Sequence, residues 1–422
     1  MIIRIPKGTQ DILPKDISKW YYVENKIREV LIKYGYQEIR TPIFEYTELF
    51  VRGVGDSSDI VTKEMFTFLD RKGRSLTLRP EGTAAVVRSY LENKMSRVYP
   101  VLKLFYLGPM FRCEKPQAGR FRQFHQFGIE VIGTKAPEVD AEVIIASIEV
   151  YKKLGLKNLK IMINSVGCKK CRAIYVQKIK ESLKDKMDFL CLECKDRYNK
   201  NPLRILDCKK DSCQKVIKKM PTINEYLCQD CRQHFTEVKS YLDSLGIKYF
   251  IEPRLVRGLD YYTKTTFEII SGELGAQDAI GGGGRYDDLI EELGGDSTPA
   301  VGFAAGIERI IMVMNQQNIE WPKDKGLDIF IVKVKETNKD MAFKLLQKVR
   351  DAGLSADMDY SSKSLKSQMR LAHKIGAKYT LIVGEEELAK NMVTLRNMQT
   401  KEQKEVEMDN LIDELILCIN ST

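Results

Sequence analysis

Charged and polar side chains alternate along two strand-like runs within residues 108–133, at positions where an ordinary sheet would carry apolar residues. Successive side chains of an extended segment point to opposite faces, so one face is expected to collect four polar groups. These are Arg112 and Glu114 from the first run, and Gln126 and Glu130 from the second. Burying such groups without partners is costly, so the face needs a polar ligand or mutual pairing. Because Gly128 leaves room beside them, the pattern is typical of a nucleotide-binding site.

The segment LVRGLDYY, residues 255–262, carries a second candidate group. Arg257 is expected to head a strand in which Tyr261 and Tyr262 point to opposite faces, so that one tyrosine belongs to the core. A lone arginine usually lies on the surface. In this run a surface position and a buried site stay equally open for Arg257.

A run of four glycines, residues 281–284, precedes Arg285 and Tyr286. It is not a P-loop, because GxxxxGK[ST] is absent, and it lacks the GxGxxG pattern of a dinucleotide site. Two interpretations stay open: a backbone bend that brings Arg285 or Tyr286 to a ligand, or a plain flexible turn.

Eight of the ten cysteines lie within residues 168–231, a stretch with 16 Lys and Arg against 9 Asp and Glu. They form four pairs: Cys168 and Cys171, Cys191 and Cys194, Cys208 and Cys213, and Cys228 and Cys231. Such pairs are typical of two tetrahedral zinc sites, with reduced thiols as the alternative. The stretch is expected to form a separate inserted module.

Length and composition set the class of protein. A chain of 422 residues exceeds what one core usually holds, so two or three domains are expected. The net charge of +10 favours a polyanionic partner without requiring one. We expect a cytoplasmic protein without a membrane span, because no apolar run is long enough and the first residues do not resemble a signal peptide. Structural disulfides are then disfavoured.

Apolar spacing predicts the elements that must position these residues. A helix is expected over residues 17–34, then a strand over 36–39, and a strand leading into a helix over 76–91. A further helix is expected behind Gly306, with Arg309 in its first turns. Residues 315–326 are typical of a linker, and residues 327–422 alternate strands and helices in a compact α/β pattern.

Seven segments, in this order, resemble the class II aminoacyl-tRNA synthetases, and specifically the bacterial histidyl-tRNA synthetase family, over essentially the whole chain. They are KGTQDILP, TPIFEYTELF, TLRPEGTAAVVRSY, FRCE with RFRQFHQFGIEVIG, LVRGLDYYTKTTFE, GGGGRYDDL and VGFAAGIERI. The resemblance implies an α+β fold. A catalytic domain with an antiparallel sheet would span residues 1–325, interrupted by a Cys-rich insertion domain at 168–250, and an α/β anticodon-binding domain would span 326–422. It also implies a homodimer formed through the helix and strand that end at Pro42.

The same resemblance implies a role for each site residue. Arg112 and Arg257 would be catalytic, on the α-phosphate of ATP, and Glu114 and Arg309 would also bind ATP. The residues expected to bind histidine are Glu81, Thr83, Gln126, Glu130, Tyr261, Tyr262 and Tyr286. Those expected at the acceptor end of the tRNA, reading the extra 5′ guanylate and the discriminator base, are Gln117, Arg120 and Arg122; a loop that only folds over ATP is the alternative.

The implied reaction is ATP-dependent ligation of histidine to its tRNA through a histidyl-adenylate, with Mg²⁺ on the outer phosphates and no protein nucleophile. His125 is expected to be a hydrogen-bonded structural residue. The cysteines depart from the family's commoner form, whose insertion lacks them. The prediction that the insertion binds Zn²⁺ therefore depends on the spacing of the cysteines alone. Two rivals remain: a regulatory protein of histidine biosynthesis that binds histidine without activating it, and a non-catalytic zinc and RNA-binding protein.

Overall fold

The computed structural model describes residues 2–55, 58–116, 119–272, 278–322, 326–335, 339–361 and 363–420. The chain divides into two compact units, Met1–Pro322 and Lys323–Thr422. Within the described ranges, no helix combines the length and the apolar character that a membrane span requires.

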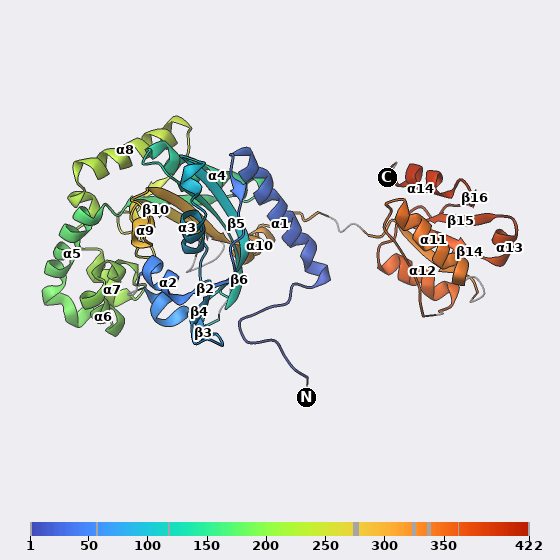
Figure 1. The fold of residues 1–422 in the computed structure, drawn as a ribbon, viewed down its shortest axis with the longest axis horizontal. Coiled ribbons are helices and arrows are strands. Elements are labelled where there is room, and N and C mark those ends of the chain that lie inside the picture. The colour runs from blue at the N-terminus through green and yellow to red at the C-terminus, as the bar shows by residue number, and fades with distance from the viewer. Residues whose placement is uncertain are drawn as a thin grey trace. The chain divides into compact units, whose positions relative to one another are not determined.

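An eight-stranded, largely antiparallel sheet forms the centre of the first unit (Figure 1). Its strands, in spatial order, are β1 (Gln37–Glu38), β5 (Leu102–Phe111), β6 (Gln123–Ile132), β11 (Ala300–Gly306), β10 (Ala279–Arg285), β9 (Thr263–Ser271), β7 (Leu159–Ser165) and β8 (Phe250–Ile251). Only the outermost described pairs, β1 with β5 and β7 with β8, are parallel. The expected α+β class with an antiparallel sheet is therefore confirmed.

Helices bury both faces of this sheet. On one face, α1 (Pro14–Lys33), α4 (Pro137–Lys153) and α10 (Ile307–Gln316) pack against odd-numbered residues of the central strands such as Phe105 and Phe127. On the other face, α3 (Thr83–Glu92) and α9 (Leu289–Glu292) pack with even-numbered residues such as Leu104 and Tyr106. Figure 1 shows α1 and α3 on opposite sides of the sheet. Because both faces are covered, polar residues of β5 and β6 are buried unless a site admits solvent.

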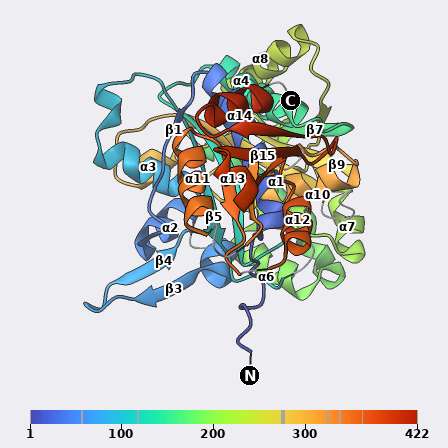
Figure 2. The same ribbon diagram turned by 90° about the vertical axis from the view of Figure 1, so that its right-hand side faces the viewer.

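A small three-stranded sheet extends from the same unit. Its order is β2 (Phe44–Tyr46), β4 (Ser75–Leu78) and β3 (Phe66–Leu69), and α2 (Thr47–Val54) and a π-helical turn (Ile60–Glu64) lie beside it. Figure 2 shows β3 and β4 projecting as a ribbon from the body of the unit. A short 3₁₀ turn, Met95–Arg97, follows α3.

The cysteine-rich segment folds into short helices between β7 and β8, seen in green in Figure 1. They are α5 (Lys169–Leu183), α6 (Leu192–Lys200), α7 (Asp211–Ile217) and α8 (Gln229–Ser244), with 3₁₀ turns at Lys184–Phe189, Pro202–Asp207 and Ile223–Tyr226. Most of them share a hydrophobic core separate from that of the sheet. The later turns of α8 instead bury Phe235, Val238 and Leu242 in the main core. The insertion is thus a small module held to the sheet by its last helix.

A buried ion-pair network joins this helix to the sheet. Arg285, on β10, donates to Asp140 on α4 over 3.0 Å, and His234 on α8 lies 2.8 Å from the other Asp140 oxygen. Burial alone would raise the pKa of Asp140, but Arg285 and His234 together lower it. Arg285 therefore connects β10, α4 and, through Asp140, α8. The backbone bend that would have brought Arg285 to a ligand is not formed.

The second unit is a compact α/β domain, as its alternating pattern predicts. Its five-stranded sheet has the order β13 (Ala356–Met358), β12 (Ile329–Lys333), β14 (Tyr379–Val383), β15 (Met392–Asn397) and β16 (Gln403–Glu407). Its helices are α11 (Lys339–Asp351), α12 (Leu365–Lys374), α13 (Glu385–Ala389) and α14 (Leu411–Asn420).

Candidate active site

A cleft of about 810 Å³ opens between the sheet and the insertion within the first unit. Among its lining residues are five that the sequence singled out: Arg112, Glu114, Arg120, Arg257 and Arg309. These come from three separate stretches of the chain: the connection between β5 and β6, the loop before β9 and the start of α10. Their convergence gives the cleft a concentration of guanidinium groups suited to a polyphosphate.

Arg112 and Glu114 line this cleft from a loop. The expectation that both lie within a strand is wrong, because β5 ends at Phe111. The Arg112 amide still donates to the Arg122 carbonyl, but the next amide, that of Cys113, donates to Glu64 instead. The ladder therefore stops, and the alternation of faces stops with it. The Arg112 side chain is held by a 2.9 Å hydrogen bond to the Pro80 carbonyl.

Arg257 also lies in a loop, so the strand expected to begin with it is absent. Strand β9 begins only at Thr263, and the preceding loop bonds elsewhere, with the Asp260 amide donating to Val54. The Arg257 guanidinium forms an ion pair with Glu268 on β9. Its Nε is buried and has no hydrogen-bond partner among the described residues. A buried guanidinium with spare donor capacity is poised to bind an anion.

The glycine run forms the interior of strand β10, so neither the bend nor the flexible turn is correct. Each glycine admits a close neighbour that a side chain would displace. A Cβ on Gly282 would lie 2.6 Å from Arg257 Cζ, and one on Gly283 would lie 2.1 Å from the Gly302 carbonyl oxygen. The missing side chains let the Arg257 guanidinium lie directly on the sheet.

Arg309 extends from the first turn of α10 and hydrogen-bonds two backbone carbonyls, those of Gly119 and Ala279. Burial and the nearby positive charge of Arg120 lower its pKa. Arg120 in turn donates to Glu114 over 2.8 Å. Because these cations crowd one another, an anionic ligand in the cleft would relieve their repulsion.

Of the residues expected at the tRNA acceptor end, Arg120 lines the cleft and Arg122 does not. Arg122 donates to the Glu114 carbonyl at 3.3 Å and to the Lys7 carbonyl at 3.4 Å, so it fastens the N-terminal segment to this loop. Gln117 lies outside the described residues.

A buried polar cluster lies on the face of the sheet covered by α3. At its centre is Glu130 of β6, which is 1% exposed. Thr83 donates to one Glu130 oxygen over 2.7 Å, and the Tyr286 hydroxyl donates to the other over 2.5 Å. Burial raises the pKa of Glu130 to about 8, although both hydrogen bonds oppose the shift. This carboxyl group is therefore positioned and held partly protonated near neutral pH.

Glu81 and Gln126 adjoin the cluster. Glu81 accepts from the amides of Thr83 and Ala84 at 2.7 and 2.8 Å, so it caps the start of α3. Burial raises its pKa. The side-chain oxygen of Gln126 is buried without a hydrogen-bond partner among the described residues. An unsatisfied buried acceptor of this kind is suited to a ligand N–H group.

Both Tyr261 and Tyr262 are buried, whereas the sequence placed only one of them in the core. Their rings are neighbours, with centroids 4.8 Å apart, and Tyr261 also makes an edge contact with Tyr286 at 5.6 Å. The alternation argument fails here because these residues precede the strand. The result is an aromatic wall beside Glu130.

Gly128 does not leave open space, contrary to expectation, because Tyr106 fills it. The two residues face each other across the β5–β6 ladder, and a Cβ on Gly128 or on Gly82 would lie 2.3 Å from the Tyr106 ring. The Tyr106 hydroxyl is buried with no hydrogen-bond partner in the described part of the chain. Sequence reasoning missed Tyr106, although a tyrosine opposite a glycine in the hairpin register was the available signal.

The insertion supplies cations that sequence reasoning also missed. Arg197, Arg204, Lys209 and Lys218 line the cleft opposite the sheet. Arg204 Nη2 and Arg197 Nη2 donate to the same Asp59 oxygen at 2.9 and 3.1 Å. The excess of basic residues in the insertion was visible in the sequence. Which of these residues face the cleft, however, depends on the tertiary fold.

The eight paired cysteines converge into two groups of four. Cys168, Cys171, Cys228 and Cys231 form one, and Cys191, Cys194, Cys208 and Cys213 form the other, with the sulfur atoms of each group within 4.8 Å of one another. Pairs one and four therefore meet, and pairs two and three meet. Each group has the composition of a tetrathiolate metal site.

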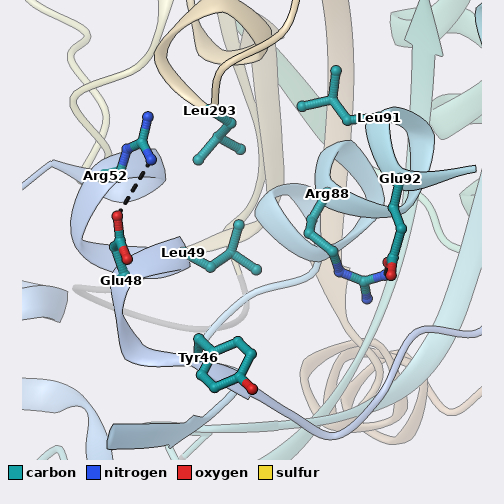
Figure 3. Close-up of a pocket in the computed structure, with 8 residues that line it drawn as sticks. All are labelled: Tyr46, Glu48, Leu49, Arg52, Arg88, Leu91, Glu92 and Leu293. Atoms are coloured by element: carbon teal, nitrogen blue, oxygen red, sulfur yellow. Dashed lines mark hydrogen bonds and ion pairs between the residues drawn. The ribbon is translucent and has the colours of Figure 1, made fainter. Parts of the chain in front are cut away.

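His125 is a structural residue, as expected. Its Nδ1 lies 3.0 Å from Glu308 Oε1, and its ring makes an edge contact with Trp20 at 4.8 Å. A shallower depression of about 310 Å³ lies apart from the cleft, between α2 and α3 (Figure 3). It contains none of the predicted site residues.

Comparisons with known proteins identify the family of the chain. The histidyl-tRNA synthetase family profile matches residues 8–310, and an anticodon-binding domain profile matches residues 328–416. The histidine–tRNA ligase of Halothermothrix orenii is 53% identical, covering 98% of this chain and 99% of its own, and that of Desulforamulus reducens is 51% identical, covering 98% of both. The apo histidyl-tRNA synthetase of S. aureus has 42% identity and a TM-score of 0.83, covering 98% of this chain and 100% of its own. The chain therefore belongs to the histidyl-tRNA synthetase family.

Proposed function

We propose that this protein uses ATP to attach histidine to its tRNA. The observation that carries the proposal is the meeting of Arg112, Arg257 and Arg309 with Glu114 in one cleft, within the unit that buries Glu130 among polar partners. A cationic cleft suits the phosphates of ATP, and a buried acceptor beside aromatic residues suits an imidazole ring.

The reaction comprises two transfers. The histidine carboxylate attacks the α-phosphorus of ATP, the bond to the bridging oxygen breaks, and pyrophosphate leaves. The terminal adenosine hydroxyl of the tRNA then attacks the carbonyl carbon, and AMP leaves. The protein contributes positioning and charge stabilisation. Arg112 and Arg257 contact the α-phosphate, and Arg257 has the unused donor at Nε to do so.

ATP and histidine are recognised by separate groups. Glu114 accepts from the adenine amino group, and Arg309 lies against adenine and the γ-phosphate. Glu81, Thr83 and Gln126 hold the amino and carboxylate groups of histidine. Glu130 and Tyr262 pair with the imidazole nitrogens, and Tyr261 and Tyr286 enclose the ring. A site built on such pairs rejects amino acids that lack them by roughly 10⁴–10⁵.

Mg²⁺ would be held by carboxylates that line the cleft, such as Glu268 and Asp278. These oxygen ligands fit the ion. It would neutralise charge on the outer phosphates when bound. Zn²⁺ has no step in this reaction.

The tRNA would contact several parts of the chain. In this proposal Gln117, Arg120 and Arg122 meet the acceptor end, the insertion at residues 168–250 supports the acceptor arm, and residues 326–422 bind the anticodon. Residues 1–325 form the catalytic domain around the insertion. The reaction belongs to the cytoplasm, where charged tRNA is used.

A homodimer is part of the proposal. Apolar side chains remain exposed on the small sheet and the segment before it: Ile43 at 45%, Phe44 at 52%, Tyr46 at 53% and Leu69 at 69%. Tyr46 also borders the shallow depression in Figure 3, whose other walls include Leu49, Leu91 and Leu293. An exposed apolar patch of this kind is typical of a subunit interface. Sedimentation equilibrium should give twice the mass of one chain.

Histidine-dependent exchange between ATP and pyrophosphate tests the activity. Labelled pyrophosphate should enter ATP only when histidine is present, and tRNA charging should follow with histidine tRNA. Absence of exchange in folded, pure protein would contradict the proposal and favour a histidine-binding regulatory protein instead.

A further inference from the structure

The two cysteine groups of the insertion have the dimensions of single-metal sites. The Sγ atoms of Cys168 and Cys171 are 3.6 Å apart, and those of Cys191 and Cys208 are 3.9 Å apart. A tetrahedral Zn²⁺ with Zn–S bonds near 2.3 Å separates its sulfur atoms by about 3.8 Å. These distances are far longer than the roughly 2.05 Å of a disulfide bond. The geometry thus matches four thiolates around one ion.

Burial and backbone hydrogen bonds support the same conclusion. Cys171, Cys194, Cys213 and Cys231 are each at most 1% exposed. The Cys228 amide donates to the Cys171 sulfur at 3.1 Å, and the Cys191 amide donates to the Cys213 sulfur at 3.2 Å. Such N–H groups stabilise negative sulfur. In each group they link one cysteine pair to the other, so they orient the ligands across the site.

The N-termini of three helices also favour negatively charged sulfur at these positions. Cys168, Cys191 and Cys228 occupy the N-cap positions of α5, α6 and α8. Two ions with eight thiolates would add −4, and the segment that contains them has 16 Lys and Arg against 9 Asp and Glu. The positive charge of this segment therefore offsets the negative charge of the two sites, and the net charge of the segment stays positive.

The two groups secure different parts of the insertion. The first joins its beginning to the start of α8, and the adjoining Gly167 carbonyl accepts from the Lys264 amide at the start of β9. The second closes the loop of residues 191–213, which contains the 3₁₀ turn Pro202–Asp207.

That loop reaches the walls of the cleft. Besides the contacts of Arg197 and Arg204 with Asp59, Asn201 donates to Asp260 over 2.9 Å. Arg204 Nη1 would lie 3.3 Å from a Cβ on Gly258, the residue next to Arg257. The second group therefore fixes the segment that packs on the Arg257 loop.

We propose that each group binds one Zn²⁺, that the first ion fastens the insertion to the sheet, and that the second holds Arg197 and Arg204 against the cleft. Zinc is the ion of choice because four thiolates satisfy its preferred tetrahedral coordination. The sites are closed, with no ligand position left for water, so the ions are structural. This inference does not depend on the aminoacylation activity.

Metal analysis of the full-length protein tests it. The protein is purified without chelators or metal-affinity resin, and about two zinc ions per chain are expected. The double variants Cys171→Ser/Cys231→Ser and Cys194→Ser/Cys213→Ser should each retain about one. Cys418→Ser, in the other unit, should retain both. A content near one or zero in the wild type, or iron in place of zinc, overturns the proposal.

A second measurement covers variants that fail to fold. Titration of the wild-type protein with a mercurial reagent should release two zinc ions as the eight thiols of the insertion react, in addition to those of Cys113 and Cys418. Co²⁺ substitution should give the visible absorption of tetrahedral thiolate sites. Amide hydrogen exchange then distinguishes the structural roles of the two ions. Loss of the second ion should accelerate exchange over residues 197–207, and loss of the first should accelerate it at Lys264. The same exchange pattern in both variants contradicts separate roles.

Discussion

Thr83 and Glu130 lie far apart in the sequence and are joined by a 2.7 Å hydrogen bond, with the threonine hydroxyl donating. Tyr286 donates to the other Glu130 oxygen, so both carboxyl oxygens are engaged before any ligand binds. The carboxyl group is thereby fixed in orientation. A ligand N–H group meets an acceptor that needs no reorganisation, which favours tight and selective binding.

Glu130→Gln should weaken histidine binding selectively. Only the oxygen of the new amide can accept, so one of the buried donors among Thr83, Tyr286 and the imidazole loses its partner, which costs about 1–3 kcal/mol. The KM for histidine in the exchange assay should rise by roughly 10–100-fold, with the KM for ATP changing less than about twofold. Glu138→Gln, on the exposed start of α4, is the matched control. An equal rise in both KM values would contradict the assignment.

The stability of the free protein should fall with rising pH on account of Glu130. Its pKa is about 8 in the folded protein, against an ordinary value of 4.5. Between these values the folded state holds a proton that the unfolded state has lost, so the free energy of unfolding decreases as pH rises. The advantage of the wild type over Glu130→Gln should shrink by up to about 1.4 kcal/mol per pH unit. Urea unfolding at pH 5.5, 6.5 and 7.5 measures this, and a constant difference would argue against a buried protonated carboxyl group.

Arg257→Ala should lower the exchange rate by about 10²–10³, because a preorganised donor to the reacting phosphate is lost. Arg257→Lys should recover little of that loss, since an ammonium group cannot bind two oxygens in the plane that a guanidinium offers. Arg370→Ala, on the exposed surface of α12 in the other unit, should leave exchange unchanged. Full activity of the lysine variant would show that charge alone suffices.

Gly282→Ala and Gly283→Ala should separate activity from stability. The new Cβ at position 282 meets the Arg257 guanidinium, which can swing aside, so exchange should fall at least about tenfold with little change in unfolding free energy. The new Cβ at position 283 meets the Gly302 backbone, which cannot yield, so stability should fall by about 1–3 kcal/mol. Thermal unfolding and exchange assays on both variants check this, and equal stability losses would contradict it.

Local sequence patterns predicted the elements better than the contacts between them. The apolar stripe expected over residues 17–34 corresponds to α1 (Pro14–Lys33), because a helical face must be buried to be stable. The glycine run misled because glycine is rare inside strands. Its strand exists to admit Arg257 and the Gly302 backbone, which are contacts that only the folded sheet creates.

In the candidate site too, the sequence indicated individual residues but not the contacts that they make. Arg112, Glu114 and Glu130 could be selected from their hairpin, yet the end of β5 at Phe111 depends on the Cys113 amide finding Glu64. Tyr106 was missed because its place against Gly128 requires the exact pairing of two strands. The cysteine pairs were evident, but which pairs meet depends on the path of the chain through the insertion.

The first and last cysteines of the insertion, Cys168 and Cys231, belong to the same sulfur group. The two ends of the cysteine-rich segment therefore lie close together, and a host domain tolerates an insertion of that kind well. Evolution can therefore exchange this appendage, or supply it with new ligands and new charges, while the sheet and the loops that carry Arg112 and Arg257 stay unchanged.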